Sequence, residues 1–425
     1  MGKKLNFIIL TFLVVICAYT ASHYEELSSA IDSGDTAWML VASAFVLLMT
    51  PGLSFFYGGM INKKNIISTM LQSFIALGVI SVLWVTVGFS LAFGDSFGGV
   101  IGNPFTYFAF NHVGSEPNPA FSSTIPFLLF ALFQLKFAII TPALITGSFA
   151  GRVRFRSYIF FMVLFSIFIY CPLAHMTWHP DGLFRNWGVL DFAGGTVVHM
   201  SAGFAALAGA VFLGSRELIV QHTANVPYVI LGTGLLWFGW FGFNAGSALG
   251  ANSTAVIAFA NTNIASATAM ITWIFYERML GRKMSAVGAC IGAVVGLVAI
   301  TPAAGFVNIG QSMFIGFIAS IISNWAINLK NKSGIDDTLD VFPTHGIGGI
   351  VGMLLTAVFA SGVGLVYGET STFLYHLLVL LITTVFCFGG SYALYMLVDL
   401  LLPMRVRKDQ EEMGLDLSQH GEQVE

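Results

Sequence analysis

Two histidines stand out because each lies within an apolar stretch and follows an aspartate at the same spacing. His199 comes eight residues after Asp191, and His345 comes eight residues after Asp337. Ionisable side chains are costly inside a membrane and usually mark a transport pathway or a proton relay. A single histidine of this kind is more simply explained by a backbone partner in the protein core. Two histidines at matching positions favour a shared function.

The chemistry open to such a pair is the sharing of a proton between facing ring nitrogens, so that each ring fixes the tautomer of the other. Burial and like-charge repulsion oppose protonation of both rings, and we expect the pair to be neutral. Asp191 lies about 12 Å along a helix from His199, because each residue adds 1.5 Å. We therefore expect Asp191 to cap the helix start, to order carbonyl groups around a cation, or both. Asp337 would do the same at the opposite end.

The composition predicts that a lipid bilayer surrounds most of the chain. Of the 425 residues, 56% are hydrophobic and only 9% are charged, whereas soluble domains average about 25% charged residues. The net charge of −3 is uninformative about nucleic-acid or acidic partners, and we expect no nucleic acid to bind. The four cysteines have no metal-binding spacing, and we find no HExxH, P-loop or GxSxG motif. We therefore expect no enzyme activity, no cofactor and no metal.

The apolar runs predict an all-α polytopic membrane protein with 11 transmembrane helices. Each run is long enough to cross about 30 Å of hydrocarbon, and none has the alternating pattern of a barrel strand. The expected spans are residues 38–61, 68–94, 125–149, 156–178, 195–214, 227–247, 254–277, 284–302, 307–328, 344–362 and 372–402.

Basic residues gather in alternate loops and thereby predict the orientation, since cytoplasmic loops are rich in Lys and Arg. The opposite loops contain only Arg185. The mature N-terminus is expected outside and the C-terminus in the cytoplasm. The two aspartate–histidine pairs recur five spans apart, so they cross in opposite directions, as a five-plus-five inverted repeat would require. The basic residues of the inner set are Lys63, Lys64, Arg152, Arg154, Arg156, Arg216, Arg278, Arg282, Lys283, Lys330, Lys332, Arg405, Arg407 and Lys408.

The two ends of the chain differ from the rest. Residues 1–22 combine Lys3 and Lys4 with a short apolar run, which predicts a signal peptide. An uncleaved first helix is the alternative. Residues 23–403 form the predicted membrane domain. Residues 404–425 form a polar cytoplasmic tail that is too short to fold alone.

Eight segments, ordered from the first span to the tail, carry a resemblance to a known family. They are PGLSFFYGG (51–59), FQLKFAIITPALITG (133–147), AHMTW (174–178), LDFAGGTVVH (190–199), WFGFNAGSA (240–248), GLVAITPAAG (296–305), DVFPTHGIGG (340–349) and GLDLSQHGE (414–422). With these motifs the chain resembles the ammonium transporter (Amt/Mep/Rh) family, and AHMTW and WFGFNAGSA are similar to its Amt branch.

The resemblance implies a homotrimer in the cytoplasmic (inner) membrane, with one pore in each subunit. An outer site would recruit ammonium, the cation would lose a proton, and ammonia would pass along a hydrophobic pore lined by twin histidines. A PII-type regulatory protein would dock on the tail and the inner loops, although inter-subunit packing of the tail is also open. The residues implied are Trp178, Phe137, Ser247, Phe243 and Asp191 for substrate binding, and His199, His345 and Thr301 for the pore.

Two residues depart from the family pattern. Lys136 adjoins Phe137 inside a span, where a lysine costs about 2.5–3.5 kcal/mol at the bilayer centre. Gly151 stands where an acidic residue is common. Lys136 should point about 100° away from Phe137 on the helix, and its charge would affect the potential of the outer site. The sequence offers no physical explanation for Gly151.

Other functions are compatible with the same fold. An ammonium sensor would use the site for signalling, and a channel for another small neutral gas would use the pore alone. Trp178 and AHMTW favour ammonium over such a gas. An intramembrane enzyme has the least support, because no nucleophile and base stand together.

Overall fold

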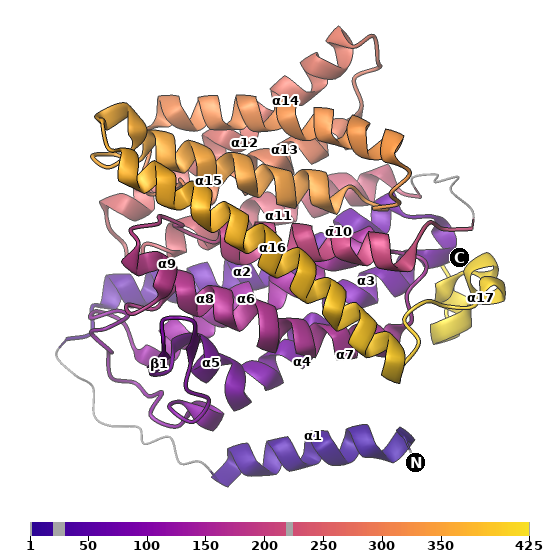
Figure 1. Cartoon of the computed structure of the whole chain (residues 1–425), viewed down its shortest axis with the longest axis horizontal. Helices are drawn as coiled ribbons and strands as arrows, with labels where there is room; N and C mark the ends of the chain where they lie inside the picture. The colour runs from indigo at the N-terminus through magenta and orange to yellow at the C-terminus, as the bar shows by residue number, and fades with distance from the viewer. Residues whose placement is uncertain (1, 20–29, 218–223, 425) are drawn as a thin grey trace.

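A bundle of long helices makes up most of the computed structural model, which describes residues 2–19, 30–217 and 224–424. Figure 1 shows the long helices running side by side, with a small β-hairpin near one end of the bundle and the C-terminal helix near the other. Within the described residues, ten segments are long and apolar enough to cross a membrane. This agrees with the membrane domain that the composition predicts.

Some of the ten segments are single helices, and others are broken by a turn of 3₁₀- or π-helix. The single helices are α2 (Ser33–Met60), α11 (Val226–Gly246), α12 (Ser253–Met279), α14 (Ile309–Ser333) and α16 (Thr370–Leu401). The first broken segment comprises η1 (Lys63–Asn65), α3 (Ile66–Phe74), α4 (Ala76–Leu83), η2 (Trp84–Gly88) and α5 (Phe89–Phe93), and the second comprises α6 (Phe127–Ile145) and η4 (Thr146–Ser148). The third comprises α7 (Phe155–Phe165), η5 (Ser166–Tyr170), α8 (Cys171–Trp178) and α9 (Leu183–Asn186). The fourth comprises η6 (Gly195–Met200) and α10 (Ser201–Leu213), and the fifth comprises η7 (Phe342–Ile347) and α15 (Gly348–Phe359).

The expected span 284–302 contains a shorter apolar helix, α13 (Ala286–Ile300), of 15 residues. At 1.5 Å per residue such a helix rises only about 22 Å. The turns that follow α13 extend the chain, and Thr301 and Ala303 in them remain fully buried. The remaining elements are β1 (Ser96–Phe97), β2 (Ile101–Gly102), η3 (Phe108–Phe110), η8 (Leu365–Tyr367), α17 (Lys408–Met413) and η9 (Asp416–His420).

The N-terminal helix α1 (Gly2–Tyr19) lies along the outside of the bundle, next to η2 and η3 (Figure 1). Its apolar side chains are largely exposed, with Phe7 at 71% and Phe12 at 64%. Part of the region where the sequence predicts signal-peptide cleavage, residues 20–22, lies outside the described residues.

The bundle brings its helices very close together at glycines. The segments that carry the two histidines cross where Gly203 of α10 meets Gly346 of η7. A Cβ atom on Gly203 would collide with the backbone nitrogen of Gly346. Small residues permit such an approach between membrane helices. This crossing places the histidine-bearing turns η6 and η7 side by side in the core.

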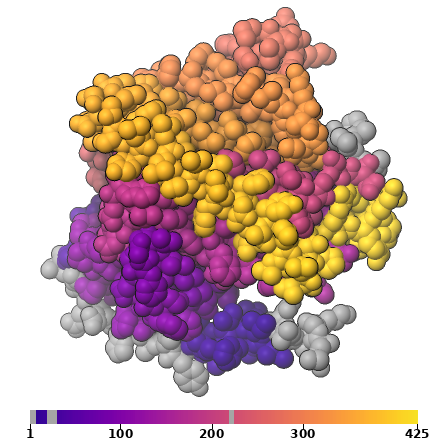
Figure 2. All heavy atoms as spheres, in the orientation of Figure 1, coloured from indigo at the N-terminus to yellow at the C-terminus, as the bar shows by residue number. Residues whose placement is uncertain are grey.

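The outer surface of the bundle is apolar, as expected of helices that face lipid. Figure 2 shows α16 running diagonally across the visible face of the molecule. Its exposed side chains include Leu374, Leu381 and Val385, each more than 60% exposed.

Candidate functional site

A cavity of about 430 Å³ opens at the end of the bundle where α8 ends and η6 begins. We call it the aromatic cavity, because seven of its lining residues carry aromatic rings. It contains four of the residues predicted for substrate binding: Phe137, Trp178, Asp191 and Ser247. Its lining comprises Phe93, Ala120, Phe121, Phe130, Gln134, Phe137, Thr177, Trp178, Arg185, Gly188, Val189, Leu190, Asp191, Phe192, Ser247, Leu249 and Phe306.

A row of rings leads from the aromatic cavity into the core. Trp178 meets Phe137 edge to face, with ring centroids 5.7 Å apart and planes at 80°. Phe137 lies over Phe243 at 4.2 Å and 32°. Phe243 in turn lies 6.1 Å from the ring of His199. Phe137 and Phe243 are almost completely buried. These two rings therefore separate the cavity from the histidines behind them.

The two histidines meet at the end of this row. The Nδ1 atoms of His199 and His345 are 3.3 Å apart, and the ring planes differ by 25°. Both residues are buried, with exposed fractions of 1% and 2%. A hydrogen bond between two Nδ1 atoms requires one to donate and the other to accept, so two neutral rings would have different tautomers. Within the described part of the chain, His199 Nε2 is buried without a hydrogen-bond partner.

A tryptophan fixes the position of the first histidine. The ring of Trp240 stacks on His199 at 5.4 Å and 20°. Its Nε1–H donates to Thr301 Oγ1 at 2.9 Å, and the Thr301 hydroxyl donates to the carbonyl of Leu297 at 2.8 Å. Thr301 thus bonds to Trp240, which packs on His199, and Trp240 was not among the residues predicted from the sequence. The signal that marks Trp240 is its spacing of three residues from Phe243, on one face of α11.

Each histidine lies on a π-helical turn that an aspartate caps. The Asp191 carboxylate accepts the backbone N–H groups of Gly194, Gly195 and Thr196 at 2.8, 2.6 and 2.8 Å, together with the Thr196 hydroxyl. These bonds begin η6, which contains His199. The backbone carbonyl of Asp191 also accepts Trp178 Nε1–H at 3.1 Å. Asp191 therefore orders both the histidine turn and the tryptophan of the aromatic cavity.

The second aspartate repeats this arrangement. Asp337 accepts the backbone N–H groups of Val341 and Phe342 at 3.2 and 2.8 Å. These bonds begin η7, which contains His345. The recurring spacing in the sequence thus corresponds to a recurring local structure.

Ser247 and Lys136 have contrasting positions near the aromatic cavity. The Ser247 hydroxyl donates to the Phe243 carbonyl at 2.9 Å, which leaves its oxygen lone pairs available to a cavity ligand. Lys136 is half-buried on α6 and is not among the residues that line the cavity. Gly151 has a φ of +85°, and an added Cβ atom would lie 2.9 Å from Asn65 Nδ2. A glycine relieves both the backbone strain and the contact there.

Comparison with known proteins decides the family. The model of the "Ammonium Transporter Family" matches residues 37–425. An ammonium transporter of Aquifex aeolicus is 46% identical over 98% of this chain and 99% of its own length. The crystal structure of Saccharomyces cerevisiae Mep2 superposes with a TM-score of 0.84 at 33% identity, covering 91% of this chain and 90% of that one. A solved structure described as a sensor Amt protein covers 91% of this chain and 98% of its own, with a TM-score of 0.84 and 29% identity.

This chain belongs to the ammonium transporter family. It is therefore a multi-pass membrane protein of a transporter family and not an enzyme, as the sequence predicts. The match begins at residue 37, after the N-terminal helix α1.

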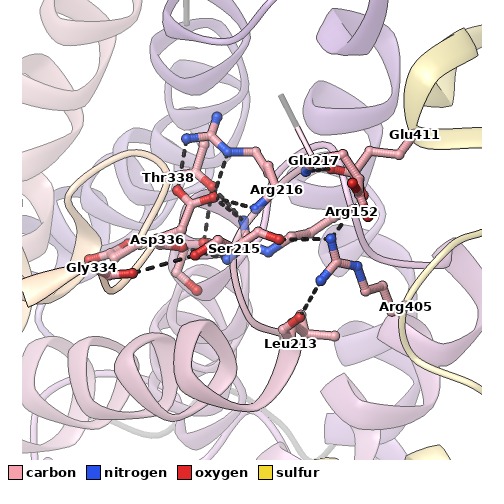
Figure 3. A network of polar contacts seen from close by, with 12 residues as sticks. Arg152, Leu213, Ser215, Arg216, Glu217, Gly334, Asp336, Thr338, Arg405 and Glu411 are labelled. Carbon is pink, nitrogen blue, oxygen red and sulfur yellow. Dashed lines mark hydrogen bonds and ion pairs between the residues drawn. The ribbon is translucent and has the colours of Figure 1, made fainter. Parts of the chain in front are cut away.

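Ion pairs connect the loops at the end of the bundle opposite the aromatic cavity. Figure 3 shows Arg152, Arg216 and Asp336 meeting there. Arg216 Nη2 lies 2.7 Å from Asp336 Oδ1, and Arg152 Nη1 lies 3.8 Å from Asp336 Oδ2. Burial lowers the pKa of Arg152 to about 10, against the opposing charge of Asp336. Burial alone would raise the pKa of Asp336, but hydrogen bonds from Arg216 and the Arg152 charge outweigh it and lower the pKa.

The tail joins the same network. Glu411 accepts the Glu217 N–H at 2.7 Å and pairs with Arg405 at 3.2 Å (Figure 3). Further along, Asp416 accepts the N–H groups of Ile67 and Ser68 at 3.0 and 2.7 Å, at the start of α3. The tail thus packs on loops of its own chain.

The residue that precedes helix α3 does not cap it with its side chain. Asn65 occupies the N-cap position but makes no side-chain cap bond. Its Oδ1 instead accepts the Leu415 N–H at 2.8 Å. A residue about 350 positions later, Asp416, therefore supplies the acceptor that α3 needs.

Gln134 and Arg185 are among the lining residues that were not predicted to belong to the site. Gln134 lies three residues before Phe137 on α6, and in the described structure its buried Oε1 atom has no hydrogen-bond partner. Helical spacing from Phe137 is the signal that marks it. Arg185 also lines the aromatic cavity, and its Nη1 donates to the Trp178 carbonyl at 3.2 Å. From the sequence alone, Arg185 bears only on the predicted orientation.

Proposed function

We propose that this protein transports ammonium, and that the aromatic cavity is its recruitment site. The row of rings from Trp178 through Phe137 and Phe243 to the paired histidines supports this proposal. It connects a chamber that can hold a cation to two buried imidazoles. The family match and the relatives named as ammonium transporters support the choice of substrate.

The aromatic cavity offers a small cation two kinds of contact. The faces of Trp178 and Phe137 provide cation–π attraction, worth about 0.5–2 kcal/mol each. The Ser247 hydroxyl accepts a hydrogen bond from an N–H donor. Ammonium has four such donors and potassium has none, so directional donation distinguishes the two ions.

Beyond Phe137 and Phe243 the path favours the neutral species. A bare ion in a low-dielectric interior faces a desolvation penalty of tens of kcal/mol. Loss of a proton removes that penalty, and ammonia then passes by hydrogen bonding along His199 and His345. If the proton stays outside, the flux is electroneutral; if it follows through the histidines, the flux carries current.

We further propose 11 transmembrane helices, with α13 as the eighth, and a five-plus-five inverted repeat. The two capped histidine turns support the repeat, because they place matching residues on η6 and η7. The aromatic cavity would face outward, and the tail would face the cytoplasm on the side of the basic loops. Residues 1–22 would be removed as a signal peptide. The working assembly would be a homotrimer in the cytoplasmic membrane, surrounded by lipid.

The proposal is tested by solid-supported membrane electrophysiology on the purified protein in liposomes. A transient current that ammonium evokes and potassium does not would establish electrogenic transport. Ammonia flux without current, followed with a pH-sensitive dye inside the liposomes, would establish the neutral route. Absence of both would reject transport.

A second candidate function is ammonium sensing, because the solved sensor Amt protein shares this fold over 91% of the chain. A cytoplasmic PII-type protein that docks on the tail and inner loops would then carry the signal. Saturable ammonium binding without flux would favour sensing over transport.

A further inference from the structure

The aromatic cavity has one positively charged side chain in its lining, Arg185, and one negatively charged side chain, Asp191. These two charges are engaged very differently. The Asp191 carboxylate already receives three backbone N–H groups and one hydroxyl. Arg185 is exposed, and among the described residues no carboxylate forms an ion pair with it. Its charge is therefore the less compensated of the two.

Arg185 also occupies a place that would attract a cation. Its Nη1 donates to the carbonyl of Trp178, the last residue of α8. Carbonyl groups at a helix C-terminus carry partial negative charge and bind cations favourably. The same residue contributes the indole ring to the aromatic cavity. A resident cation thus binds the backbone of the tryptophan that we propose recruits ammonium.

We propose that Arg185 is a charge filter, which lowers the affinity of the cavity for all cations and excludes divalent ones. This inference rests on the proposed recruitment function of the aromatic cavity. Coulomb repulsion is proportional to the product of the charges, so a divalent ion experiences twice the repulsion that ammonium does. Ammonium then enters weakly and leaves easily, while Mg²⁺ is prevented from occupying the entrance.

Three variants separate the charge of Arg185 from its hydrogen bond. Arg185→Gln keeps an N–H donor for the Trp178 carbonyl and removes the charge. Arg185→Lys keeps the charge. Arg185→Ala removes both. Each variant is purified as the full chain, and its binding of ammonium chloride and magnesium chloride is measured by isothermal titration calorimetry at low and high ionic strength.

The charge filter predicts that the Gln and Ala variants behave alike. At low ionic strength both bind ammonium about three- to fivefold more tightly than the wild type, and Mg²⁺ about tenfold or more. The Lys variant stays close to the wild type. High salt reduces all these differences, because it screens exposed charges.

The opposite patterns overturn the proposal. If only the Ala variant differs from the wild type, Arg185 acts as a helix cap and not through its charge. If the Lys variant changes with the other two, the shape of the guanidinium matters and the charge does not. If no variant binds ammonium, both the charge filter and the recruitment site are rejected. Altered binding in a protein that shows no flux in liposomes rejects transport alone and leaves the filter standing.

Discussion

The two aspartate-capped histidine turns are built alike but are surrounded differently. Asp191 accepts four donors and borders the aromatic cavity, with 7% of its surface exposed. Asp337 accepts two backbone N–H groups and is fully buried. Near Asp337, Lys330 Nζ lies 2.7 Å from Asp340 Oδ1 and donates to the Asp337 carbonyl at 3.0 Å.

The difference lies in what surrounds each capped turn. At the cavity end, aromatic rings and the Ser247 hydroxyl lie near the capped turn, and aromatic faces attract cations. At the other end, ion pairs lie around the turn that Asp337 caps, and they connect several loops. The copy at the aromatic cavity is thus accessible to a ligand, and the copy at the opposite end is held among charged side chains.

Removal of the cap next to the aromatic cavity should have the largest effect. Asp191→Ala leaves three backbone N–H groups and the Thr196 hydroxyl without their acceptor. Hydrogen bonds to charged groups are worth about 1.5–3 kcal/mol each, so we expect a large fall in melting temperature in detergent and loss of ammonium flux. Asp337→Ala, which removes two bonds, should lower the melting temperature less. The reverse order would contradict the comparison of the two turns.

The two histidines should act as one unit. His199→Ala and His345→Ala should each change ammonium flux or selectivity on the order of tenfold, and the double variant should be no worse than either. The variants are compared by flux in liposomes, with size-exclusion chromatography to verify that the assembly remains intact. Additive effects, or unaltered flux and selectivity in His199→Ala, would count against the shared role.

The sequence predicts most of the helical frame because the bilayer fixes the length and the polarity of each span. The expected span 125–149 contains α6 and η4, and the expected span 254–277 lies entirely within α12. The helix breaks were not predicted. The η6 and η7 turns depend on carboxylates that compete for local backbone donors, and apolar periodicity does not record such bonds.

The candidate site was predictable to different degrees. The meeting of His199 and His345 follows from equal spacing in two oppositely directed spans, whereas Trp178 and Ser247 were selected only by family resemblance. The contact of Trp240 with Thr301 joins residues 61 positions apart, and no local pattern encodes it. The docking of the tail on α3 likewise joins residues far apart in the sequence, and no local pattern encodes it.

The stability contribution of the buried Asp337 carboxylate should respond to pH. Burial, and then the charge of Asp340, raise the pKa of Asp337 to about 6 from an ordinary value of 3.8. The folded protein therefore holds this proton more tightly than the unfolded chain does. The resulting stabilisation is complete below the ordinary pKa and is lost as the pH rises through about 6.

The side chain introduced by Asp337→Asn cannot ionise, so the substitution should remove the pH-dependent stabilisation that comes from Asp337. Between about pH 4 and pH 6.5 its melting temperature should change less with pH than that of the wild type, at constant ionic strength. Parallel curves for the two proteins would show that Asp337 does not titrate in this range.

The smallest effect is expected from removal of the Ser247 hydroxyl, which lines the aromatic cavity. Ser247→Ala removes one acceptor, and we expect the half-saturating ammonium concentration to rise about two- to tenfold, with the maximal flux unchanged. Ser43→Ala is the matched control, because the Ser43 hydroxyl also donates to a carbonyl four residues earlier, but does not line the aromatic cavity. Identical half-saturation in both variants would remove Ser247 from the recruitment site.

The cap that Asp416 provides for α3 has a consequence for biosynthesis. The α3 segment is among the first parts of the bundle to leave the ribosome, yet its missing acceptor arrives about 350 residues later. Its first turn stays unfinished until the tail has been made and has folded back. A truncated product lacking this carboxylate would keep that turn open, and its frayed backbone would be visible to proteases that clear incomplete chains.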